Sequence, residues 1–103
     1  MQYTTFNSFL RDIAFIRRRQ RPGDELMLTM LDDLHLQISQ LFHNVAGFIF
    51  IWRTEYDILP IDEPTLPSNT LGDVSLVHGD YGLAVCFEHE SDVAIFKLMQ
   101  GHD

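Results

Sequence analysis

The longest amphipathic stretch of the chain runs from Asp24 to Ala46. Its apolar residues recur at intervals of three and four, which places them on one side of a helix that turns 100° per residue. This stripe consists of Met27, Met30, Leu31, Leu34, Ile38, Leu41, Phe42 and Val45. We therefore predict a long helix over residues 24–46, with Asp24 as its N-cap and Gly47 at its C′ position.

A second helical pattern precedes this one and reaches Arg19, with Thr4 or Thr5 as its N-cap. Its apolar stripe consists of Phe6, Phe9, Leu10, Ile13 and Ile16. The Pro22-Gly23 pair breaks the pattern before the long helix begins. So short a connection predicts an antiparallel helical hairpin over residues 4–46.

The second half of the chain reads as strands followed by a helix. Residues 48–52 form an unbroken apolar run, which predicts a central strand buried on both faces. Residues 74–77 and 81–87 predict two further strands, joined by a three-residue turn. In the last of these strands, the small side chains of Ala84 and Cys86 face one way, which suits a closely packed helix.

The end of the chain predicts a third helix, from Asp92 to Gln100, with Ser91 as its N-cap. Residues 55–72 lack periodicity and contain three prolines, so we expect a long loop that forms a contact surface and packs down only in part.

These elements predict an α+β fold in one domain, residues 1–103, with the hairpin at 4–46 and the rest at 47–103. The two-helix N-terminal hairpin should pack on a small, mostly antiparallel, three-stranded sheet with a short C-terminal helix, all helices lying on one face. The residues expected to be buried together are Leu34, Ile38, Leu41, Phe50, Trp52, Val85, Phe87 and Phe96.

Composition narrows the class of protein. Hydrophobic residues make up 46% of the 103 residues, which indicates a globular chain. No apolar run is long enough to span a bilayer, and no signal peptide is visible. A single cysteine, Cys86, excludes an internal disulfide and suits a reducing compartment, so we expect a cytoplasmic protein, in the host cytoplasm if it is viral.

The net charge of −8 is unevenly distributed. Residues 1–22 contain five arginines and one aspartate, a net charge of +4, whereas the remainder contains two cations and fourteen carboxylates, a net charge of −12. Such polarity allows partners of either sign to bind different faces. The predicted partner-binding carboxylates are Asp32, Asp33, Asp57, Asp62 and Glu63.

The first helix offers an alternative site. Arg11, Phe15, Arg18 and Arg19 share one face, and arginines interleaved with an aromatic side chain suit phosphate contacts and base stacking. The overall acidity opposes nucleic-acid binding, because strong binders are usually basic overall.

Two groups of residues resemble catalytic or metal sites. Cys86, His78 and Asp80 have the side chains of a nucleophilic triad, but a cysteine between apolar strand residues is usually a core residue. Carboxylates and histidines also gather near the C-terminus: Glu88, His89, Glu90, Asp92, His102 and Asp103. Their spacing matches no metal motif, so we expect a solvated acidic turn, no metal, no cofactor and no enzymatic activity.

Residues 81–101 end in a strand, a turn and a helix that carries the triplet Phe96-Lys97-Leu98. This ending resembles the C-terminal segment of short, uncharacterised proteins of tailed bacteriophages. The resemblance implies a viral source and carries over no activity and no site residue.

The sequence thus favours a non-enzymatic interaction protein, of viral origin, that binds and modulates a host or partner protein. A nucleic-acid-binding module or a structural oligomer component are the alternatives. We also expect a homodimer, because Leu36 and Phe15 lie nearly opposite the apolar stripes of their helices and would otherwise be exposed.

Overall fold

A computed structural model of the protein describes residues 2–52, 64–79 and 82–100, and within them it contains a four-stranded sheet and three helices. The elements are, in chain order, β1 (Tyr3–Thr5), α1 (Phe6–Arg19), α2 (Asp24–Leu41), β2 (Gly47–Trp52), β3 (Val74–Gly79), β4 (Gly82–Phe87) and α3 (Asp92–Gln100). The α+β class and the helical hairpin are therefore confirmed.

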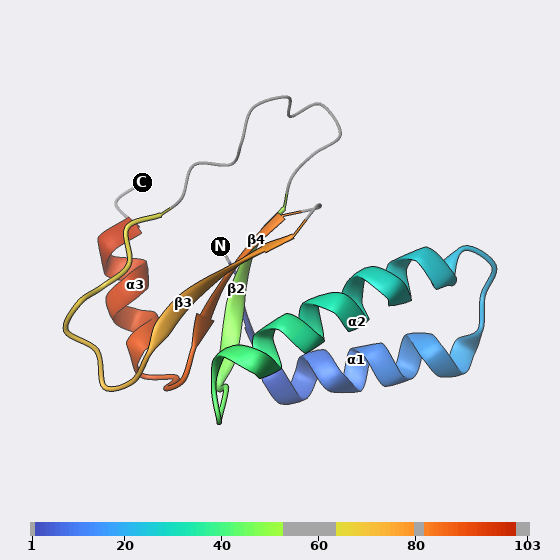
Figure 1. Ribbon diagram of the computed structural model, residues 1–103, viewed down its shortest axis with the longest axis horizontal. Helices are drawn as coiled ribbons and strands as arrows, with labels where there is room; N and C mark the ends of the chain where they lie inside the picture. Colours follow the sequence, from blue (N-terminus) through green and yellow to red (C-terminus); the bar gives the residue numbers. More distant parts are fainter. Residues whose placement is uncertain (1, 53–63, 80–81, 101–103) are drawn as a thin grey trace.

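The sheet has the order β1-β2-β4-β3, and every neighbouring pair is antiparallel. The α1–α2 hairpin lies on one face and α3 on the other (Figure 1). The predictions of three strands and of all helices on one face are both wrong. The extra strand, β1, has only three residues, which are too few for an alternating pattern to be recognised.

The start of the hairpin matches the prediction closely. Thr5 is the N-cap of α1, and its Oγ1 accepts a hydrogen bond of 3.1 Å from the backbone N–H of Ser8. The N-cap of α2, however, is Gly23 and not Asp24. Gly23 has a φ of +91°, a conformation that glycine adopts at little cost, and this displaces Asp24 into the first turn.

The long helix ends earlier than predicted, at Leu41 rather than at residue 46. Phe42 takes an extended conformation and is buried, so its side chain joins the core from outside the helix. Gly47 belongs to β2 and is not a helix cap. A Cβ atom there would lie 2.5 Å from the hydroxyl oxygen of Tyr3 and still closer to the carbonyl oxygen of Thr4, so the pairing of β1 with β2 requires glycine.

The sheet divides the core into two clusters. The cluster under the hairpin contains Phe9, Ile13, Leu34, Ile38, Phe42, Phe48, Val77, Ala84 and Cys86. The cluster under α3 contains Ile49, Val85, Phe87, Val93 and Phe96. Adjacent residues of β2 thus enter opposite clusters, which confirms a strand buried on both faces. The small side chains of β4 face the hairpin, as expected for close packing.

The prediction of one common core of eight residues is wrong in two respects. The eight residues are divided between the two clusters, with Leu34 and Ile38 on the face opposite Phe96. Leu41 is 43% exposed because the helix ends there. Phe50 packs against the hairpin cluster while remaining half-buried, and the side chain of Trp52 lies outside the described residues.

The connections also differ from the predictions. β3 extends two residues further than expected, to Gly79, and β4 begins at Gly82; the register pairs these two glycines, so only two residues separate the strands. Those two residues, 80 and 81, lie outside the described residues. Within the described part of the long loop, Leu66 packs against the α3 cluster, which confirms that this part folds down.

Candidate functional site

The α1–α2 hairpin is held to the sheet at one end, and its connecting end projects away from it (Figure 1). Phe9 and Ile13 of α1 and Ile38 of α2 are buried against the sheet. An 18-residue helix rises about 27 Å, whereas a six-residue strand spans only about 20 Å. The apolar stripe of the hairpin is therefore longer than the surface available to cover it.

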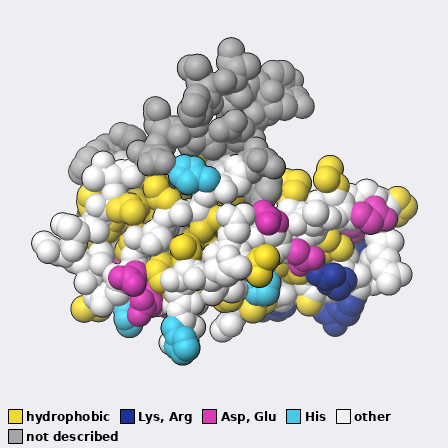
Figure 2. Space-filling view, viewed as in Figure 1, with side chains coloured by type: hydrophobic (Ala, Val, Ile, Leu, Met, Phe, Trp, Pro, Cys, Tyr) yellow, Lys and Arg dark blue, Asp and Glu magenta, His cyan; other side chains and the backbone are white. Residues whose placement is uncertain are grey.

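A groove of about 860 Å³ opens where the hairpin and the sheet diverge. Its apolar lining comes from both helices and from β2: Phe9, Ile13, Ile16, Leu26, Met27, Met30, Leu31, Leu34, Phe48 and Phe50. At its outer end, Leu26 is 72% exposed and Met27 is 43% exposed. Figure 2 shows hydrophobic and acidic side chains together at the surface of the projecting hairpin.

The polar side chains that line the groove are few, and one of the three is acidic. Asp12 of α1 lines it together with Gln2 and Thr4. Asp33 lies seven residues after Leu26, on nearly the same side of α2, and its Oδ2 accepts a hydrogen bond of 2.7 Å from Gln37. Among the described residues, neither of these two aspartates takes part in an ion pair. The groove is thus apolar inside and negatively charged at its border.

The other predicted acidic residues are not all available to a partner. Asp32 accepts hydrogen bonds of 2.8 Å at both carboxylate oxygens from Arg17, and this ion pair links α2 to α1. Asp57, Asp62 and Glu63 lie outside the described residues. The structure therefore leaves Asp33 exposed on α2, outside the groove lining, and places Asp32 in a contact within the hairpin.

The predicted basic face loses one member. Arg19 donates hydrogen bonds of 2.8 and 3.0 Å to the carboxylate of the buried Asp24, so this arginine supports the turn between the helices. The hydrogen bond from Arg19 lowers the pKa of Asp24 and raises that of the guanidinium. Arg11, Phe15 and Arg18 remain exposed on α1.

Among the described residues, Cys86 does not share a face of the sheet with His78, the base expected beside it. Cys86 is fully buried, and burial raises the pKa of its thiol to about 12, so the nucleophilic thiolate does not form near neutral pH. The register pairs Cys86 with Ser75, three residues before His78, so His78 faces the opposite side of the sheet. Asp80 lies outside the described residues.

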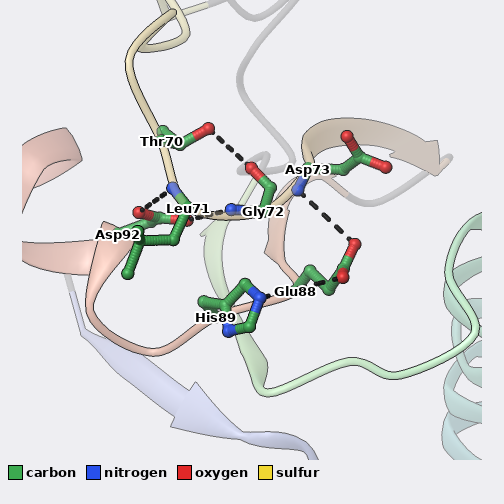
Figure 3. A network of polar contacts seen from close by, with 7 residues as sticks. All are labelled: Thr70, Leu71, Gly72, Asp73, Glu88, His89 and Asp92. Atoms are coloured by element: carbon green, nitrogen blue, oxygen red, sulfur yellow. Dashed lines mark hydrogen bonds and ion pairs between the residues drawn. The ribbon is translucent and has the colours of Figure 1, made fainter.

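Two carboxylates after β4, those of Glu88 and Asp92, take part in a network of hydrogen bonds with the loop before β3 (Figure 3). The buried Asp92 carboxylate accepts hydrogen bonds of 3.0 and 3.1 Å from the backbone N–H groups of Leu71 and Gly72. Glu88 accepts a 3.5 Å hydrogen bond from the backbone of Asp73 and lies 3.8 Å from His89.

Within the described ranges, no three histidine, cysteine or carboxylate side chains gather as a metal site would require. Glu90 is exposed, and the predicted ligands His102 and Asp103 lie outside the described residues.

Comparisons with protein-family models, with the curated proteins and with the solved structures find no match. In the described part of the chain, no helix is both long enough and apolar enough to cross a membrane.

The groove was missed by the sequence prediction because the whole α2 stripe was expected to be buried. A signal was present: the stripe of α2 is longer than the strands that follow, and Leu26 and Met27 stand at its far end. A helix that outruns its sheet leaves that end uncovered.

Proposed function

We propose that this protein is a non-enzymatic interaction protein that binds a partner protein through the groove between the α1–α2 hairpin and the sheet. The observation that supports this most directly is the exposure of Leu26 and Met27 at the end of a continuous apolar lining. Contiguous exposed apolar surfaces rimmed by polar residues mark interaction sites in soluble proteins.

The charge distribution supports the same function. The chain carries a net charge of −8, Asp12 lines the groove, and Asp33 is exposed on nearly the same side of α2 as Leu26. A partner with a basic surface would be steered toward this side of the molecule. The resemblance of residues 81–101 to phage proteins extends the proposal to a viral protein that modulates a bacterial host protein.

Site-specific photo-crosslinking tests this function. A photoreactive phenylalanine analogue is placed at position 26, in the groove, or at position 98, which is 73% exposed on α3, on the other face of the sheet. In lysate of a bacterial host, we expect position 26 to capture a discrete protein that position 98 does not. Equal capture from both positions, or none from position 26, would contradict the proposal.

The basic face of α1 supports a second candidate function, nucleic-acid binding. Phe15 is 57% exposed, and Arg11 and Arg18 flank it at helical spacing without an ion pair to a described residue. A gel-shift assay with salt titration tests this candidate. Binding that weakens steeply with salt and is lost in Arg11→Ala/Arg18→Ala would favour it over the groove.

A further inference from the structure

We propose that the groove accommodates an amphipathic α-helix of the partner protein, with lysine or arginine residues flanking its apolar face. This inference rests on the proposed function and adds to it the conformation and charge of the bound segment. It follows from three properties of the groove: its few hydrogen-bonding groups, the short strand at its edge, and the carboxylates at its border.

The lining of the groove favours a segment whose backbone needs no external hydrogen bonds. Ten of its fourteen residues are apolar, and the polar side chains are those of Gln2, Thr4 and Asp12. A backbone N–H or C=O buried against apolar side chains without a partner is costly. A helix satisfies these groups internally along its length, whereas an extended segment does not.

An extended segment would have to pair with β1, the edge strand on this side of the sheet. β1 consists of only three residues, Tyr3–Thr5. Very short edge strands are poor templates for adding another strand. Helix docking therefore suits this groove better than strand addition.

The apolar side chains also suit the surface of a helix. Leu26 and Met30 are four residues apart on α2 and present a ridge along the groove, opposite Ile13 and Ile16 of α1. Methionine side chains are unbranched and adapt to irregular surfaces, and they are common in grooves that bind helices. We expect the partner to insert apolar residues at positions i, i+3 or i+4, and i+7.

The charge at the border determines the flanks of the partner helix. Asp12 lines the groove, and Asp33 lies two turns after Leu26 on nearly the same side of α2. Arg19, at the connecting end of the hairpin, is already paired with Asp24. A basic flank therefore meets carboxylates that form no ion pair with a described residue, whereas an acidic flank meets charges of its own sign.

Selection from a library of random 16-residue peptides tests the inference and does not require the partner to be identified. The folded full-length protein is the target, and its Leu26→Glu variant removes peptides that do not need the groove. We expect the selected peptides to show apolar residues at helical spacing together with an excess of lysine and arginine. An alternating apolar pattern, or an acidic pool, would overturn the inference.

Binding of one selected peptide, measured by fluorescence anisotropy, then tests the geometry. Leu26→Glu should weaken binding at least tenfold, because it places a charge against the apolar face. Leu98→Glu is the matched control: Leu98 is 73% exposed on α3, on the other face of the sheet, and its replacement should change affinity less than twofold. Circular dichroism establishes that both variants are folded; both side chains are more than half exposed in the native protein.

The charge requirement has its own variant. Asp12→Lys should lower the affinity for a basic peptide about two- to fivefold, as expected for the loss of an exposed ion pair, and this loss should be smaller at high salt. Glu90→Lys, an exposed charge reversal after β4, is the control. Equal effects of the two reversals would contradict the proposed role of the groove border.

The outcomes separate this inference from the proposed function. If the selected peptides depend on the groove but are not basic amphipathic helices, the proposed function stands and the inference about the bound helix is wrong. If no peptide depends on Leu26 and crosslinking at position 26 also captures nothing, both fail. If Leu26→Glu instead converts a dimer of the free protein to a monomer in light scattering, the groove binds a second copy and the inference is wrong.

Discussion

Replacement of Asp92 offers the sharpest test of how α3 is held to the loop that precedes β3. Its carboxylate is fully buried at the start of α3, and one oxygen accepts a hydrogen bond from Leu71 while the other accepts one from Gly72. This single side chain thus joins α3 to the loop that leads into β3. No apolar contact in the same place could satisfy both backbone donors.

The expected magnitude follows from these two contacts. A hydrogen bond to a charged group contributes about 1.5–3 kcal/mol, and an unpaired buried donor costs about 1–3 kcal/mol. Because Leu71 is an exposed residue, water can reach part of the site after truncation. We therefore expect Asp92→Ala to lower the free energy of unfolding by about 2–4 kcal/mol. The free energy of unfolding of a domain of this size is about 5–15 kcal/mol, so the variant should still fold.

Urea unfolding followed by circular dichroism measures the loss, and amide hydrogen exchange at Leu71 and Gly72 locates it. The stability of Asp92→Asn should lie between those of the wild type and Asp92→Ala, because the amide oxygen can still accept one of the two hydrogen bonds whereas the amide nitrogen cannot accept the other. Asp73→Asn, an exposed change beside the same loop, is the control and should stay within about 0.5 kcal/mol. If Asp92→Ala lowers the free energy of unfolding by less than that value, the stabilising role of the Asp92 hydrogen bonds is refuted.

Four further predictions follow from the described contacts. Leu34→Ala should cost about 2–5 kcal/mol in urea unfolding, whereas Leu41→Ala should cost less than about 1 kcal/mol because Leu41 is largely outside the core. Cys86 should react with a thiol reagent at pH 8 only after denaturant unfolds the protein, because burial raises the pKa of its thiol to about 12. The pKa of Asp24 in the folded state is lowered from 3.8, so its contribution to stability is present above that pH and disappears as the pH falls below it. In Asp24→Asn, the melting temperature should therefore depend less on pH over this acid range than in the wild type. An unchanged pH dependence would contradict the role of the Asp24 ion pair. A homodimer mass is expected from light scattering at micromolar concentration, and Leu36→Glu should shift it to a monomer if that exposed leucine is in the interface.

The helices could be predicted largely because their signals are local. Thr5 caps α1 through its own side chain, and the apolar spacing within each helix reports a single buried side. The end of α2 could not be predicted in this way. Phe42 and Val45 continue the helical spacing, yet Phe42 is extended and reaches the core from outside the helix. The choice between these conformations depends on a sheet formed by residues more distant in the chain.

The sheet and the charges depend on pairings that a one-dimensional pattern does not contain. β1 is separated from β2 by the entire hairpin, and its three residues are too few to show an alternating strand pattern. Likewise, Asp32 and Asp33 are adjacent in sequence but have different roles, because only Asp32 faces Arg17 of α1. Composition gives the net charge but could not say which carboxylates remain available.

The ion pairs that remove arginines and aspartates from the candidate surfaces also shape the groove. The Arg19–Asp24 pair holds the turn at the projecting end, and the Arg17–Asp32 pair joins the two helices midway along the hairpin. Both connect α2 to residues of α1, so they limit how far the two helices can separate. A groove that is already formed before binding loses less conformational entropy when a partner enters. If the proposed function holds, the two pairs support the binding surface and are not part of it, and the carboxylates left to select a basic partner are Asp12 and Asp33, which form no ion pair with a described residue.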